Sequence, residues 1–244
     1  MPQKIIFMHG LESGILGKKS QYLRENFENV YTPDMQMSML NLKKKNSIIR
    51  NVTRTWIFRM WTFFIIIVLF RLSYDWQSLA SLFFSFVSFF LIKKRIFQSA
   101  LSMSLQQCTS IQSKALQDFK PDLVVGSSWG GLIALNCITQ KIYNCPVVLI
   151  APPVKMVLNK VDFSGQNWEN ICEKTKQISS LVHIVHGEND KVVSIEDSKK
   201  LVEKTKVSLQ IIPQGDHSLN YPLLEQQNAL SLKNIIRELE NRFQ

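Results

Sequence analysis

Three residues at separate points of the chain have the types and surroundings that covalent catalysis requires. Ser128 stands in the segment GSSWG at 126–130, which fits the pattern G-x-S-x-G. Asp190 ends the segment HGEND at 186–190, and His217 lies in the segment GDHSL at 215–219. A serine hydroxyl becomes a nucleophile when a histidine takes its proton and a carboxylate orients that histidine. These residue types therefore indicate acyl-transfer chemistry at Ser128.

The glycines around Ser128 select it over its neighbour Ser127. A serine at the apex of a strand-to-helix turn has a strained backbone, and only glycines two residues away on either side leave room for that turn. Backbone N–H groups at the start of the following helix point at the same place and can stabilise a developing oxyanion. We expect Ser128 to be the nucleophile.

Other residues compete for the remaining two roles. Asp190 could instead cap the helix expected from about residue 195. Rival acids are Glu188 and Asp216, and rival bases are His183 and His186.

The elements that must position these residues alternate between strand and helix. Short apolar runs predict strands at 5–8, 30–31, 123–125, 147–150, 182–185 and 209–212. Helical patterns lie at 18–27, 97–119, 130–141, 195–204 and 223–243, whereas 163–177 reads as loop plus helix. Such alternation predicts an α/β fold with a mostly parallel sheet and helices on both faces. The candidate residues follow strand ends, where open α/β sheets place their sites.

Composition excludes several classes of protein. The chain has 244 residues, of which 45% are hydrophobic, so it is not disordered. The low counts of Gly (9), Pro (8) and Cys (4) exclude a collagen and a disulfide scaffold. The cysteines form no C-x-x-C pair and no cluster with histidine, which predicts a reduced, intracellular setting without a metal or cofactor.

Nearly all of the net charge of +10 lies between Lys43 and Arg95, where ten basic residues accompany one acid, Asp75. These charges bracket two uncharged apolar segments, 60–70 and 76–92. A bilayer span needs about 20 mostly apolar residues, so the second segment qualifies at the short end. The first segment qualifies only if it runs from about 55 to 74, with Arg59 and Arg71 extending toward headgroups. The pattern predicts a transmembrane helical hairpin.

Basic residues on both outer flanks place the two ends of this hairpin on one side of the membrane. The expected domains are an α/β domain at 1–42 and 96–244 and a hairpin insertion at 43–95. Expected partners are anionic lipid headgroups near the basic flanks and subunits of a membrane complex. Nucleic acid is not expected, because the charge is not spread along a groove. A soluble lid, a buried helix pair and an interfacial hairpin dipping into one leaflet are the alternatives.

The combined motifs resemble the α/β-hydrolase superfamily, especially its small lidless esterases. In that family a segment H-G-x-x-D-x-x-V, here 186–193, supplies the triad acid, and the chain order is serine, acid, histidine. The resemblance implies a triad of Ser128, Asp190 and His217. His9-Gly10-Leu11 is similar to the family's oxyanion loop, which implies N–H donors from Leu11 and Trp129 and a loop-organising role for His9. The hairpin departs from the family. A cap domain in that family usually follows the strand after the helix that the nucleophile precedes, which here is the strand expected at 147–150, whereas the hairpin lies before Ser128.

Two functions remain open at this stage. One is a membrane-anchored serine hydrolase that cleaves an acyl ester or thioester. The other is a non-catalytic or residually active hydrolase-fold accessory subunit of a larger membrane complex, such as a mitochondrial respiratory assembly. The expected location is the mitochondrial inner membrane with the hydrolase domain on the matrix side, or another organelle membrane facing the cytosol.

Overall fold

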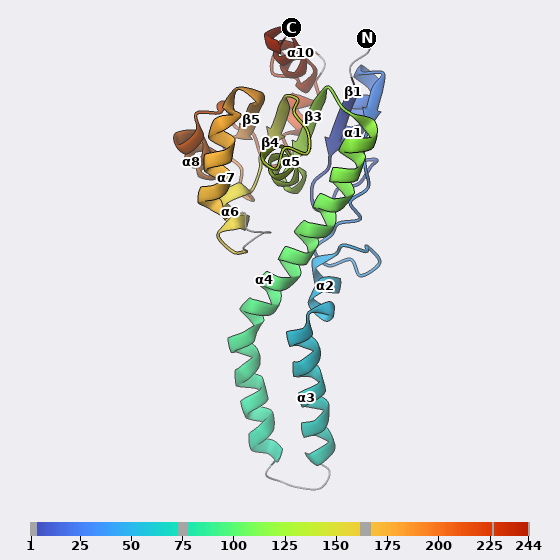
Figure 1. Cartoon of the computed structure of the whole chain (residues 1–244), viewed down its shortest axis with the longest axis vertical. Coiled ribbons are helices and arrows are strands. Elements are labelled where there is room, and N and C mark those ends of the chain that lie inside the picture. The colour runs from blue at the N-terminus through green and yellow to red at the C-terminus, as the bar shows by residue number, and fades with distance from the viewer. Residues whose placement is uncertain (1–3, 73–77, 162–166, 226, 244) are drawn as a thin grey trace. The chain divides into compact units, whose positions relative to one another are not determined.

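Six strands form one parallel sheet in the computed structural model, which describes residues 4–72, 78–161, 167–225 and 227–243 (Figure 1). Their order across the sheet is β2-β1-β3-β4-β5-β6. Each strand lies within or overlaps a range predicted from the sequence, so the predicted sheet is confirmed. The bounds are β1 Lys4–Met8, β2 Asn29–Tyr31, β3 Leu123–Ser127, β4 Val147–Ile150, β5 Val182–Gly187 and β6 Ser208–Ile212.

Helices cover both faces of this sheet. On one face, α1 (Lys18–Asn26) and α10 (Leu232–Phe243) form a buried cluster with side chains such as Phe7 and Val125. Side chains alternate along a strand, so Ile6 and Val124 point to the other face, where the buried helix α5 (Trp129–Thr139) packs on β1, β3 and β4. Between β4 and α10 the chain also forms α6 Val154–Leu158, α7 Trp168–Gln177, the 3₁₀ turn Ser179–Leu181, α8 Ile195–Thr205 and α9 Asn220–Leu223.

The parallel register brings the carboxyl ends of all strands to one edge of the sheet. Val125 of β3 pairs with Phe7 of β1 on one side and with Val148 of β4 on the other. Loops after β1, β3, β5 and β6 therefore meet at this edge, where ligand sites of open α/β sheets lie. These loops carry the residues that the sequence singled out.

The chain divides into two compact units. One comprises residues 1–35 and 107–244 and contains the whole sheet, and the other comprises residues 36–106. The second unit is larger than the predicted insertion at 43–95, whose boundaries stay a prediction.

The second unit contains α2 (Ile48–Arg54), α3 (Trp56–Leu72) and the first part of α4 (Ser78–Phe119). The amide of Asn51 donates to the hydroxyl of Ser104 at 2.8 Å, which ties α2 to α4. Trp61 of α3 and Phe89 of α4 contact each other with ring centroids 4.8 Å apart and the ring planes tilted by 36°. The two long helices therefore pack side by side within this unit (Figure 1).

Among the described residues, no single helix is long and apolar enough to cross a membrane. The pair Ile48–Arg54 and Trp56–Phe70 reaches that length only together, with a bend of 62° between its members. Residues 73–77 and several side chains on either side of them lie outside the described residues. The transmembrane hairpin therefore stays a prediction.

Two helix predictions are corrected. The helix expected at 97–119 begins at Ser78, because 78–119 contains no Gly or Pro and the basic residues at 93–95 are good helix formers. The helix expected at 223–243 begins only at Leu232. Asn228 accepts from the backbone N–H of Leu230 at 2.9 Å and Ser231 from that of Asn234 at 3.3 Å, so local side-chain bonds hold a turn before the helix.

Candidate active site

Ser128 occupies a sharp turn between β3 and α5. Its φ of 52° and ψ of −118° are strained for a residue with a side chain. A Cβ at Gly126 would lie 2.6 Å from the carbonyl oxygen of Gly130, and one at Gly130 would lie 2.0 Å from that of Met8. The two glycines thus let α5 approach β1 and β3, which holds the Ser128 turn in place.

His217 lies within hydrogen-bond reach of this serine. Its Nε2 is 3.0 Å from Ser128 Oγ, and its Nδ1 is 2.7 Å from Asp190 Oδ2. An ionised carboxylate accepts only, so Nδ1 carries the proton and Nε2 is left to accept from the serine hydroxyl. The structure brings together the three side chains that the sequence singled out, from loops after β3, β5 and β6.

Asp190 is buried and held by its own loop. Its side chain has no exposed surface, and its Oδ1 accepts from the backbone N–H groups of Val192 at 2.8 Å and Val193 at 2.9 Å. The carboxylate is therefore fixed with Oδ2 directed at His217. Asp190 does not cap α8, because the side chain of Ser194 does so.

A close approach of two loops puts Asp190 beside His217. A Cβ at Gly187 would lie 2.4 Å from the carbonyl oxygen of Gly215, so glycine at the end of β5 allows the two backbones to touch. The backbone N–H of Asn189 donates to that same carbonyl at 2.9 Å. The acid loop and the histidine loop are thus joined through main-chain groups.

The loop after β1 borders the serine. A Cβ at Gly10 would lie 3.5 Å from the Cβ of Ser128. Buried His9 pins this loop, because its Nδ1 lies 2.8 Å from the carbonyl oxygen of Gly10 and its Nε2 accepts from the N–H of Met35 at 3.2 Å. Leu11 continues the same loop, and Trp129 is the first residue of α5, whose N–H has no partner within its own helix. Their N–H groups remain the predicted oxyanion donors.

The rival acids and one rival base are engaged elsewhere. Glu188 is exposed and accepts from the backbone N–H of Gln214 at 3.2 Å. Asp216 accepts from the Ser218 hydroxyl at 2.8 Å, and this bond lowers the pKa of its carboxyl group. His183 bonds to Ser208 and Gln210 between β5 and β6.

Two contacts around this site were not expected from the sequence. His186, weighed only as a rival base, lies 3.2 Å from Asp190 Oδ2. The signal for it was the spacing of four residues between His186 and Asp190 across a tight turn. Lys19 of α1 donates from its Nζ to the carbonyl oxygen of Ser218, next to His217. Burial lowers the pKa of this lysine to about 8, against the opposing charge of Asp216.

Cysteine chemistry is disfavoured. Burial raises the pKa of the Cys108, Cys137 and Cys145 thiols to about 12 and that of Cys172 to about 11. These thiols are therefore protonated at neutral pH, whereas a cysteine nucleophile acts as the thiolate. Among the residues that the structure describes, no three His, Cys, Asp or Glu side chains form a group that could hold a metal ion.

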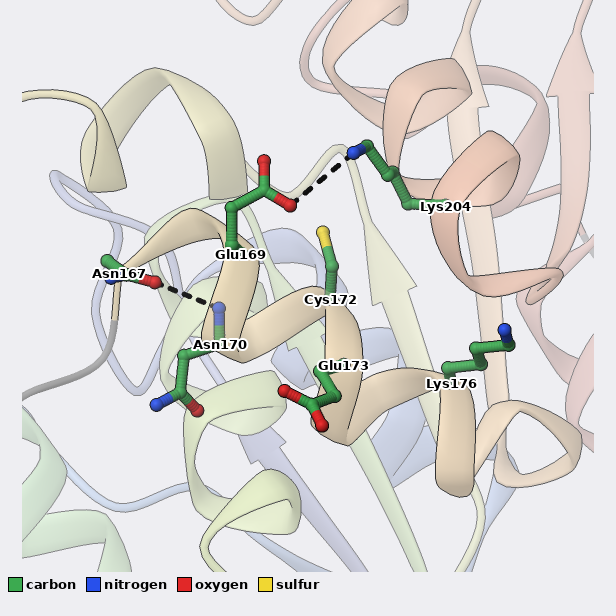
Figure 2. A pocket seen from close by; sticks show the side chains of 7 residues that line it. All are labelled: Asn167, Glu169, Asn170, Cys172, Glu173, Lys176 and Lys204. Atoms are coloured by element: carbon green, nitrogen blue, oxygen red, sulfur yellow. Dashed lines mark hydrogen bonds and ion pairs between the residues drawn. The ribbon is translucent and has the colours of Figure 1, made fainter.

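A surface depression lies away from these residues. It has a volume of about 500 Å³ and is lined by residues of α7 and its N-cap together with Lys204 of α8 (Figure 2). Glu169 and Lys204 point toward each other across it and form an ion pair of 3.4 Å. The depression shares no residue with the Ser128 site.

No protein-family model and no curated protein matches the sequence. Solved structures do match the fold. A protein assigned to the hydrolases of the α/β superfamily from Xanthomonas campestris has a TM-score of 0.51 at 15% identity, covering 99% of this chain and 98% of the other. A serine hydrolase from Cycloclasticus zankles has 0.56 at 12%, covering 99% and 90%. Est1E from Butyrivibrio proteoclasticus has 0.52 at 15%, covering 98% and 90%. The chain therefore has the α/β-hydrolase fold.

Proposed function

We propose that this chain is a membrane-anchored serine hydrolase that cleaves an ester or thioester through Ser128, His217 and Asp190. The observation that carries the proposal is the unbroken line of contacts from Ser128 Oγ to His217 Nε2 at 3.0 Å and from His217 Nδ1 to Asp190 Oδ2 at 2.7 Å. Its fold neighbours include proteins named as a serine hydrolase and as a hydrolase of the α/β superfamily.

In the first half of the proposed reaction, His217 Nε2 takes the proton of Ser128 Oγ as this oxygen attacks the acyl carbon. The resulting oxyanion accepts from the N–H groups of Leu11 and Trp129. The intermediate collapses as His217 returns the proton to the departing alkoxide or thiolate, which leaves an acyl ester on Ser128.

In the second half, His217 takes a proton from water, and the hydroxide attacks the acyl-serine. The carboxylic acid is released when the proton passes back to Ser128 Oγ. Asp190 stays ionised throughout and stabilises the imidazolium of each half-reaction. The chemistry needs no metal or cofactor.

The proposed membrane attachment is supported by apolar side chains on the outer surfaces of α3 and α4. Phe63, Ile66 and Phe70 are 60%, 62% and 69% exposed, and Phe86 and Leu91 are 61% and 75% exposed. Water around so many large apolar groups is unfavourable, whereas lipid tails solvate them. Lys93 lies over the ring of Phe90 at 4.4 Å, so a cation marks the end of the apolar stretch on α4.

Anionic lipid headgroups are the proposed contacts of the basic residues that flank this surface. We place the chain at the mitochondrial inner membrane with its hydrolase domain on the matrix side, or at another organelle membrane facing the cytosol. A non-catalytic accessory subunit of a membrane complex is the second candidate, because the same exposed helices suit packing against other membrane helices.

Turnover of nitrophenyl esters and acyl thioesters by the purified full-length chain tests the enzyme proposal. We expect Ser128→Ala to remove turnover and Ser127→Ala, the adjacent matched control, to keep it. Wild-type protein that is folded but inactive on every acyl length would favour the accessory subunit.

Flotation with lipid vesicles tests the membrane proposal. The wild type should float with vesicles containing phosphatidylglycerol, and the double variant Phe63→Asp with Ile66→Asp should remain in the bottom fraction. Ile211→Asp, at an exposed apolar position of β6, serves as the control and should float. Equal flotation of all three proteins would contradict the assignment of α3 to the membrane.

A further inference from the structure

A second histidine lies behind the proposed triad. His186 is the second-last residue of β5 and has no exposed surface. Its Nε2 lies 2.9 Å from the carbonyl oxygen of Val193 and 3.2 Å from Asp190 Oδ2, the same oxygen that faces His217. The acid of the proposed triad therefore has an imidazole on each side.

The partners of His186 determine where its proton lies. The Val193 carbonyl and the Asp190 carboxylate accept hydrogen bonds and cannot donate them, so Nε2 must carry a hydrogen. Nδ1 lies 2.7 Å from the hydroxyl of Ser198, a residue of α8 that is 1% exposed. With a neutral ring, this hydroxyl donates to Nδ1 and fixes the Nε2–H tautomer.

His186 contacts Asp190 by two routes. The first is direct, because its Nε2–H dipole lies beside Oδ2 and stabilises the buried negative charge. The second passes through Val193, whose carbonyl oxygen faces His186 while its N–H donates to Asp190 Oδ1 at 2.9 Å. Both carboxylate oxygens are thus held in places that depend on His186.

The charged groups that face His186 are carboxylates. Asp190 approaches from the loop after β5, and Asp197 acts on it electrostatically from α8. Asp197 is itself occupied, because it accepts from the backbone N–H groups of Lys155 at 2.9 Å and Met156 at 2.6 Å at the start of α6. Asp190 therefore remains the acid that His186 and His217 share.

We propose that His186 is a positioning residue of the active site, which holds the Asp190 carboxylate for His217 and is itself fixed by Ser198. This inference rests on the proposed function and extends it to a line of five side chains from Ser198 to Ser128. His186 touches neither substrate nor the reacting atoms, so its effect passes through Asp190.

The test compares His186→Leu, which removes the N–H group, with His186→Gln, whose amide nitrogen can occupy the place of Nε2. His183→Leu is the matched control, because it makes the same change on the same strand at a residue that bonds to Ser208 and Gln210 rather than to Asp190. We expect His186→Leu to lower kcat about 10- to 100-fold with little change in KM, as for loss of an interaction that matters in the transition state.

The pH profile separates positioning from a general loss of structure. Without His186 the Asp190 carboxylate is held less firmly against His217 and stabilises its imidazolium less, so the acid limb of kcat/KM should move to lower pH in His186→Leu. His186→Gln should restore most of kcat and the original limb, and His183→Leu should match the wild type in both. Unchanged kcat and pH profile in His186→Leu would overturn the proposal, as would equal losses in the Leu and Gln variants.

A second readout does not need turnover. The proton between His217 Nδ1 and Asp190 gives a separate low-field NMR signal, which should shift in His186→Leu, return in His186→Gln and stay unchanged in His183→Leu. Identical spectra of the wild type and His186→Leu would contradict the positioning role even if the wild type hydrolyses esters. The expected shifts would support that role even if the wild type is inactive. If His186→Leu does not fold, Ser198→Ala replaces it, and an unshifted signal in that variant contradicts the inference.

Discussion

The backbone of Ser128 shows how single residues create the candidate site. A positive φ at a serine is unfavourable, and this turn persists because Gly126 and Gly130, two residues away on either side, have no side chains to block the close contact of α5 with β1 and β3. The pattern G-x-S-x-G could be read from the sequence for this reason, since its physical requirement is local. The spacing of four residues between His186 and Asp190 is only a weak signal for their contact, because that contact also depends on the path of the loop between residues 187 and 193.

Gly130→Ala should destabilise the protein strongly. Its Cβ would lie 2.0 Å from the Met8 carbonyl oxygen, a main-chain atom of a central strand that cannot move aside cheaply. We expect a loss of about 2–4 kcal/mol in the free energy of unfolding, measured by urea denaturation. Gly14→Ala is the control, because nothing lies within 4 Å of its added methyl group. Equal stability of Gly130→Ala and Gly14→Ala would contradict the close approach of α5 to β1 at the Ser128 turn.

Asp190→Asn should reduce kcat by about 10³- to 10⁴-fold, because an amide at this place favours the wrong tautomer of His217. Glu188→Gln, two residues earlier and exposed, should stay within about twofold of the wild type, a change that surface positions usually tolerate. An ester assay with both variants decides between the two acids. A larger loss in Glu188→Gln than in Asp190→Asn would show that Glu188, and not Asp190, is the acid of the triad.

At the scale of elements, period and composition predicted the strands well but not the helix ends. Strands β1, β3, β4 and β5 are short runs of mainly apolar residues that are almost all buried, so their pattern is visible along the chain. The extent of α4 was missed because a basic cluster looks like a membrane boundary yet does not interrupt a helix. The helix α2 was missed as well, since tertiary contacts such as that of Asn51 with Ser104, which the sequence does not show, distinguish it from a basic flank.

Lys19 links the element α1 to the histidine loop and gives that link a pH dependence. Its pKa of about 8 lies below the ordinary value of 10.5, so the unfolded chain binds more protons between these values. Stability contributed by this position therefore rises as pH increases from about 8 to 10. The rise is at most about 3 kcal/mol for a shift of this size.

The measurement is the difference in unfolding free energy between the wild type and Lys19→Met across this pH range. The difference should grow in favour of the wild type as the pH rises. Lys18→Met, at the exposed neighbouring position, should show a constant difference. A flat difference for Lys19→Met would mean that its amine is not desolvated.

At the scale of the whole molecule, every strand and every proposed catalytic residue lies in the unit of residues 1–35 and 107–244. The two chain segments on either side of residues 36–106 are tied together, because the amide of Gln112 donates to the carbonyl oxygen of Pro33 at 3.5 Å. Deleting residues 36–106 and joining the ends by a short glycine-serine linker should therefore leave a folded protein that needs no detergent. Circular dichroism and gel filtration check this, and an unfolded or aggregated product would show that the sheet depends on the insertion.

The central claim is that Ser128 is a nucleophile activated by His217. Treating the full-length protein with a fluorophosphonate and measuring its intact mass and labelled peptide tests nucleophile, base and oxyanion donors together. We predict one adduct per chain on the peptide that contains Ser128, the same adduct in Ser127→Ala, and none in Ser128→Ala. Labelling that persists in Ser128→Ala, or a folded wild type that takes up no label, would contradict the account.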